Sequence, residues 1–185
     1  FSAWPTSLVF SGVTLAVPLI VSLVVGSSRG AVFYLVWNIA LLCNSIVSAA
    51  TSIGLRERAS AIQSRRLGTD VHIMVWCSGL ATVVLGSATV IIFGSSYLEL
   101  GLTAVPFIGL GLIPYGYLQY GALRLRRNGN DVGAAISTGC ILLSMSLLLF
   151  WLQPKSLVFV AIFWCISAVL SLVVLRAVSD RSTNE

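Results

Sequence analysis

The side chains best suited to bind a ligand gather in one apolar segment, residues 31–55. On a helical wheel with about 100° per residue, its polar and aromatic side chains fall within an arc of roughly 140°. Hydrocarbon offers such groups no hydrogen-bond partner, so this face should lie against other helices or a wet cavity. Both interpretations stay open, and the second predicts a cavity lined by Tyr34, Trp37, Asn38, Asn44 and Ser48.

Charged side chains are absent from the middle of every apolar segment. Ionisable groups inside a membrane usually mark proton relays, ion pathways and catalytic centres. The single histidine, His72, lies where an apolar segment begins, and no serine has a GxSxG context. Cys43, Cys77, Cys140 and Cys165 lie in apolar runs without a CxxC pair, which is typical of packing residues. We therefore expect no enzymatic activity, no metal site and no cofactor.

The elements that carry these side chains are predicted to be membrane-spanning helices. Hydrophobic residues make up 57% of the chain and charged residues only 9%, which excludes the globular, disordered and fibrous classes. A helix needs about 20 apolar residues to cross the hydrocarbon core. The sequence predicts one all-α, polytopic membrane domain over residues 1–185, with six spans at about 7–26, 31–55, 71–94, 102–123, 133–152 and 157–175.

The basic residues predict the orientation of these spans. The loop after the second span, which holds Arg56, the loop after the fourth, which holds Arg124, and the C-terminal tail carry all Lys and Arg residues except Arg29 and Lys155. Short loops rich in Lys and Arg stay cytoplasmic, so both termini are expected to be cytoplasmic. The net charge of +5 is thereby explained by topology and phospholipid contacts, and we expect no nucleic-acid partner.

Proline and glycine predict bends in two spans and a turn between them. Pro18 lies near the middle of the first span, and Pro106 and Pro114 lie in the glycine-rich fourth span, so we expect helix kinks at all three. The residues 27–30, SSRG, are expected to form the turn between the first two spans. In the third span, Gly79, Thr82, Gly86 and Thr89 recur at helical spacing and predict a packing face.

The end of the fourth span combines tyrosines with an amide. An aromatic belt at the membrane surface accounts for Tyr115, Tyr117 and Tyr120 without a ligand. Gln119 has two interpretations, a hydrogen bond to a sugar in the cavity or a contact between helices.

A family resemblance rests on the run PLIVSLVVGSSRGAVFYLVWNIALLCNSIVSAATSIGLRERAS, residues 18–60. A proline-bearing helix, a glycine turn, an A-x-F-Y-x-x-W helix and a charged cytoplasmic segment follow one another there. This run resembles the start of the second lobe of bacterial polysaccharide flippases, in the MOP superfamily. The later FGSSYLELG, the helix with Pro and Gly, the basic loop and two closing helices are also similar, so the resemblance spans nearly the whole chain.

The resemblance implies the C-terminal six-helix lobe of a MOP-type transporter in the bacterial cytoplasmic membrane. Such a lobe, paired with an N-terminal lobe missing from this chain, would flip a lipid-linked oligosaccharide by alternating access. The chain begins at Phe1, and we expect its natural N-terminal part to be missing or its start to be processed. Arg29, Arg56 and Arg124 are the candidate headgroup contacts. The alternative from another class is a six-helix membrane scaffold without transport activity.

Overall fold

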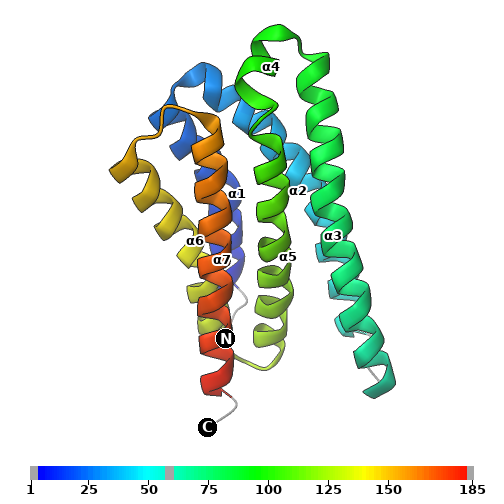
Figure 1. The fold of residues 1–185 in the computed structure, drawn as a ribbon. Helices are drawn as coiled ribbons and strands as arrows, with labels where there is room; N and C mark the ends of the chain where they lie inside the picture. Colours follow the sequence, from blue (N-terminus) through cyan, green and yellow to red (C-terminus); the bar gives the residue numbers. More distant parts are fainter. Residues whose placement is uncertain (1–3, 57–60, 183–185) are drawn as a thin grey trace.

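The structure, a computed structural model, describes residues 4–56 and 61–182 and is all-helical over these ranges. The described residues form seven helices, six long and one short (Figure 1). They are α1 (Trp4–Val25), α2 (Ser27–Arg56), α3 (Ala61–Ile92), α4 (Ser95–Gly101), α5 (Val105–Arg127), α6 (Asp131–Leu152) and α7 (Leu157–Ser182). The predicted all-α class is confirmed.

Membrane character follows from the length and apolarity of these helices. Four described stretches are long and apolar enough to cross a bilayer, namely Ser27–Thr51, Thr69–Ile92, Asp131–Leu152 and Leu157–Asp180. A shorter apolar stretch, Ser11–Val25, belongs to α1. Glycine, proline and tyrosine dilute the apolar character of α5, but its 23 residues rise about 34 Å, enough to cross the core beside the others. The chain is therefore a polytopic helical membrane protein.

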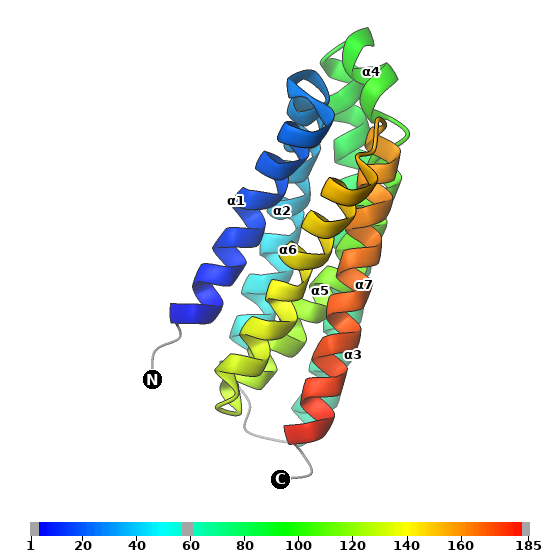
Figure 2. The same cartoon turned by 90° about the vertical axis from the view of Figure 1, so that its left-hand side faces the viewer.

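The six long helices run alternately up and down in one bundle (Figures 1 and 2). The start of α1, the end of α7 and the loop between α5 and α6 lie at one end. Basic side chains gather at this end, because α5 finishes with Arg124, Arg126 and Arg127 and Arg176 lies in the last part of α7. Arg29 and Lys155 lie at the opposite end. The described arginines and lysine thus separate by end as the sequence predicts.

Helix boundaries depart from the sequence prediction at three places. The turn expected at residues 27–30 is wrong, because α2 already begins at Ser27 and Gly26 alone reverses the chain with a φ of 90°. Only glycine adopts such a φ without steric cost. The third helix begins at Ala61, ten residues before the predicted 71, and the segment between the third and fourth predicted spans contains α4.

The three prolines have different structural roles. Pro106 is the second residue of α5. A backbone N–H in the first turn of a helix has no acceptor within that helix, so a proline there breaks no hydrogen bond, and the predicted kink is wrong. Pro18 lies inside α1 and Pro114 inside α5, and both helices continue past them. Each of these two prolines leaves the carbonyl four residues earlier without its intrahelical donor.

An aromatic cluster joins three helices in the centre of the bundle. Trp37 on α2 meets Trp164 on α7 edge-on at a centroid distance of 4.7 Å, and Tyr115 on α5 meets Trp164 at 5.2 Å. All three side chains are fully buried. Gly111 leaves the room that the Trp164 indole occupies, since a Cβ at this position would overlap the ring. The cluster fixes α2, α5 and α7 relative to one another.

The small residues of α3 form the packing face that the sequence predicts. Gly79, Thr82 and Gly86 are buried. A Cβ on Gly79 would lie 3.0 Å from the carbonyl oxygen of Gly109 on α5, which shows how closely the two backbones approach. The prediction of a close helix contact here is confirmed.

A candidate ligand cleft between three helices

The contact between α1 and α2 depends on a backbone carbonyl that has no donor within α1 because of Pro18. Because Pro18 has no N–H, the carbonyl of Thr14 lacks its usual partner within α1. The indole Nε1 of Trp37 donates to this oxygen at 3.1 Å. Trp37 also stacks on Phe33, at a centroid distance of 5.6 Å. One proline thus creates the acceptor that ties α1 to α2 at mid-length.

A cleft of about 810 Å³ lies between α1, α2 and α5. Its lining residues come from the first half of α1, the second half of α2 and the second half of α5, which is the half of the bundle that ends in the basic residues. In Figure 1, α2 and α3 lean away from α6 and α7 toward this end. The lining consists of Ser11, Thr14, Leu15, Leu41, Asn44, Ser45, Ser48, Ala49, Tyr115, Gln119, Leu123 and Arg126.

Three polar side chains in the cleft form a connected network across two helices. Asn44 on α2 donates from Nδ2 to Oε1 of Gln119 on α5 at 2.8 Å. Gln119 is in turn hydrogen-bonded to the side chain of Tyr115, one turn earlier on the same helix. Asn44 and Tyr115 are almost completely buried, whereas Gln119 is half-buried. The network therefore presents a rigid, uncharged polar surface.

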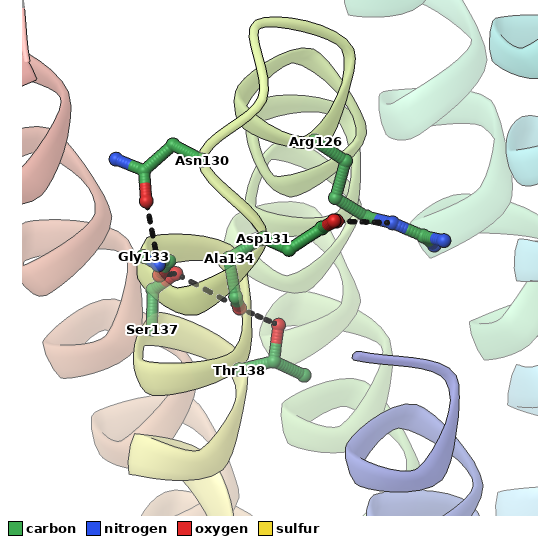
Figure 3. Close-up of polar contacts among 7 residues, drawn as sticks. All are labelled: Arg126, Asn130, Asp131, Gly133, Ala134, Ser137 and Thr138. Carbon is green, nitrogen blue, oxygen red and sulfur yellow. Dashed lines mark hydrogen bonds and ion pairs between the residues drawn. The ribbon is translucent and has the colours of Figure 1, made fainter. Parts of the chain in front are cut away.

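A charged group lies where the cleft approaches the basic end of the bundle. Among the described lining residues, Arg126 alone carries a permanent charge, and its Nε pairs with Oδ1 of Asp131 at 3.3 Å (Figure 3). Both side chains keep partial exposure, 23% and 32%. Contact with water weakens an ion pair of this kind, so the guanidinium can exchange its partner at low cost.

The start of α6 supports this ion pair. The side-chain oxygen of Asn130 accepts from the backbone N–H of Gly133 at 2.8 Å and caps the helix (Figure 3). Ser137 and Thr138 then donate to carbonyls of the first turn, including that of Ala134. Asp131 lies in the first turn, where a negative charge is favoured by the helix dipole. The cap therefore fixes the position of the carboxylate that faces Arg126.

The predicted cavity residues are divided by the structure. Asn44, Ser48 and Gln119 line the cleft. Tyr34 is 56% exposed, and Asn38 is exposed and donates to the carbonyl of Tyr34 in its own helix.

The division follows the turn of α2 itself. Within the roughly 140° arc, Trp37, Asn44 and Thr51 occupy the half that faces inward, and Tyr34 and Asn38 the half that faces outward, while the exposed Ser45 borders the cleft. Trp37 lies on the inward half but packs into the aromatic cluster, outside the cleft lining. The polar arc that is continuous on the helical wheel thus forms two surfaces in the structure, one that faces inward and one that faces outward.

The candidate headgroup arginines are also separated. Arg29 lies at the end of the bundle remote from the cleft, and Arg124 is exposed and does not line the cleft as Arg126 does. Arg56 is the last residue of α2, and its side chain lies outside the described part of the chain.

Sequence reasoning missed the contribution of α1 to the cleft and, apart from Gln119, that of α5. Ser11 and Thr14 on α1 gave no periodic signal, and Arg126 stood among the arginines interpreted as topology signals. Tyr115 was expected in a surface belt, but its side chain is 1% exposed, so that prediction is wrong for this tyrosine. Its spacing of four residues from Gln119 was the available signal, since residues four apart share a helix face.

Comparisons with family models, with curated proteins and with solved structures find no match to this chain.

Proposed function

We propose that the chain is one lobe of a membrane transporter that flips a lipid-linked oligosaccharide or polysaccharide precursor across the cytoplasmic membrane by alternating access. The observation that carries this proposal is the cleft, which combines a neutral hydrogen-bonding network, apolar side chains and one arginine. An amphiphile with a glycan headgroup needs these three surfaces together. The resemblance to polysaccharide flippases agrees with this chemistry.

The location of the cleft supports the direction of transport. Arg124, Arg126 and Arg127 of α5 and Arg176 of α7 lie at the end of the bundle toward which the cleft lies. Under the positive-inside rule this end is cytoplasmic. A precursor made in the cytoplasm would enter from the inner leaflet at this end. A second, N-terminal lobe would provide the opposing wall of the transport path.

Scaffolding is the competing function, and one contact favours it. The Asn44–Gln119 hydrogen bond joins α2 to α5, and amides between membrane helices commonly serve association alone. Transport and scaffolding differ in what they require of Asn44. A scaffold needs only the bond, whereas a transporter needs the cleft surface that the amide forms.

The test is translocation of a lipid-linked glycan by the full-length protein in proteoliposomes. We expect Asn44→Leu to reduce the initial rate by about tenfold, the effect of losing one good hydrogen bond to the substrate. Asn38→Leu is the matched control, because it makes the same change on the same helix outside the cleft. Equal rates for both variants and the wild type, or no translocation by the wild type, would exclude the proposed role.

A further inference from the structure

One atom in the cleft has an unmet hydrogen-bonding requirement. Asn44 is 3% exposed, and while its Nδ2 donates to Gln119, its Oδ1 has no partner among the described residues. Buried amide oxygens are almost always paired, because an unpaired one loses the bond that water would give. Because Asn44 also lines the cleft, a ligand that binds there is the candidate for the missing donor.

Neighbouring donors are already engaged elsewhere. The Ser45 hydroxyl donates to the carbonyl of Leu42 in its own helix, and the Thr51 hydroxyl donates to the carbonyl of Ser48. On the other side of Asn44, the Gln119 side chain uses its oxygen for Asn44 and is bonded to Tyr115. The same network fixes the amide plane of Asn44, so the orientation of Oδ1 is set before a ligand arrives.

The chemistry of this atom selects the class of ligand. An amide oxygen only accepts hydrogen bonds, so its partner must carry an O–H or N–H group. An ionised phosphate has no such donor, and a cationic amine would favour a carboxylate, which is absent from the described lining residues. Leu15, Leu41 and Leu123 border the same space and suit an alkyl chain.

We propose that Asn44 Oδ1 is a specificity-determining acceptor for a hydroxyl group on the headgroup of an amphiphile, with Gln119 and Tyr115 as positioning residues. This inference rests on the proposed function and adds to it the atom that distinguishes a hydroxyl-bearing headgroup from one that only accepts hydrogen bonds.

The experiment compares ligands that differ in their donors. The full-length protein in lipid nanodiscs is titrated with an alkyl glucoside, with a methyl-capped polyoxyethylene ether of the same alkyl chain, and with methyl glucoside, and binding is followed by the shift in thermal unfolding. The ether carries only acceptors along its headgroup, and methyl glucoside lacks the alkyl chain. We expect the alkyl glucoside to bind about tenfold more tightly than either of the other two.

Variants of Asn44 then test whether its Oδ1 atom causes the preference for a hydroxyl-bearing headgroup. Asn44→Leu should bind the alkyl glucoside and the ether with equal affinity, whereas Asn38→Leu should keep the wild-type preference. Should Asn44→Leu fail to fold, Asn44→Ala, which also removes the acceptor, replaces it, and the wild-type comparison of headgroups decides by itself. Equal binding of glucoside and ether by the wild type would overturn the inference, because it would leave solvent water as the partner of Oδ1. Equal binding of methyl glucoside would overturn its assignment to an amphiphile.

Translocation of a lipid-linked glycan, measured separately, distinguishes this inference from the function on which it rests. A protein that transports without preferring hydroxyl headgroups refutes only the assignment of Asn44. A protein that shows the preference but translocates no glycan refutes the transport function and leaves the acceptor assigned.

Discussion

At the scale of single residues, the close packing of Trp164 against Gly111 determines which residue can stand at position 111. Trp164 is fully buried, donates from Nε1 to the carbonyl of Ile108 at 3.3 Å, and lies over Gly111. Interiors are packed so closely that one added methyl group forces side chains off their rotamers. Gly111 is therefore a packing requirement of the aromatic cluster.

Gly111→Ala is expected to destabilise the protein by about 1–3 kcal/mol, because the new methyl group would overlap the Trp164 ring. Thermal unfolding followed by tryptophan fluorescence in detergent measures the change. Gly139→Ala is the control, since among the described residues a Cβ there meets Val9 alone, at 3.7 Å, an ordinary contact. The control should be neutral or slightly stabilising, because alanine favours helix over glycine. A Gly111→Ala protein as stable as this control would contradict the packing account.

The amide pair gives a second prediction at this scale. Asn44→Leu leaves Gln119 Oε1 without its donor, and Gln119→Leu leaves Asn44 Nδ2 without its acceptor, so each single variant should lose about 1–3 kcal/mol. Replacing both removes the two amides and the orphan Oδ1 together, so the double variant should lose less than the sum of the two single losses, with the lost Gln119 contact of Tyr115 as the remaining cost. A double-mutant cycle of unfolding free energies measures this coupling. Additive losses would show that the two amides do not depend on each other.

At the scale of elements, α1 and α2 are joined by a bond that depends on a proline. Trp37→Phe should cost about 1–3 kcal/mol, because the Thr14 carbonyl would then lack both its donors. In a Pro18→Ala background the same change should cost less, since alanine restores the N–H within α1. Unfolding measurements on the four proteins test this dependence. Trp76→Phe, at a tryptophan that is 59% exposed, controls for the loss of an indole.

The elements were largely predictable because each apolar run contains enough residues to cross a bilayer and ends at polar or glycine positions. The helix start at Ala61 and the short α4 were not predictable, because hydropathy marks only the part of a helix that lies in hydrocarbon. The cleft was predictable in part. The wheel for α2 selected Asn44 and Ser48, but it could not show that α5 covers only the inward half of the arc. Partners such as Tyr115 and Arg126 depend on tertiary packing that no single-helix pattern contains.

At the scale of the whole molecule, the separation of basic residues between the two ends fixes the expected orientation. With Asn128→Cys in the α5–α6 loop and Lys155→Cys in the α6–α7 connection, a membrane-impermeant maleimide should label only the second cysteine in intact cells. Both should be labelled after the membrane is permeabilised, which controls for reactivity. Labelling of the first cysteine from outside would reverse the orientation and remove the cytoplasmic entrance to the cleft.

Gly26 is the single residue between α1 and α2, so a rotation of one helix relative to the other would occur at this glycine. Ser11 on α1 lies about 22 Å along the helix from Gly26, at 1.5 Å per residue. A rotation of about 10° at Gly26 would move Ser11 by about 4 Å at that distance. Because the hydrogen bond from Trp37 Nε1 to the Thr14 carbonyl joins the same two helices, such a rotation requires this bond to break, and the bond thereby limits changes in the width of the cleft.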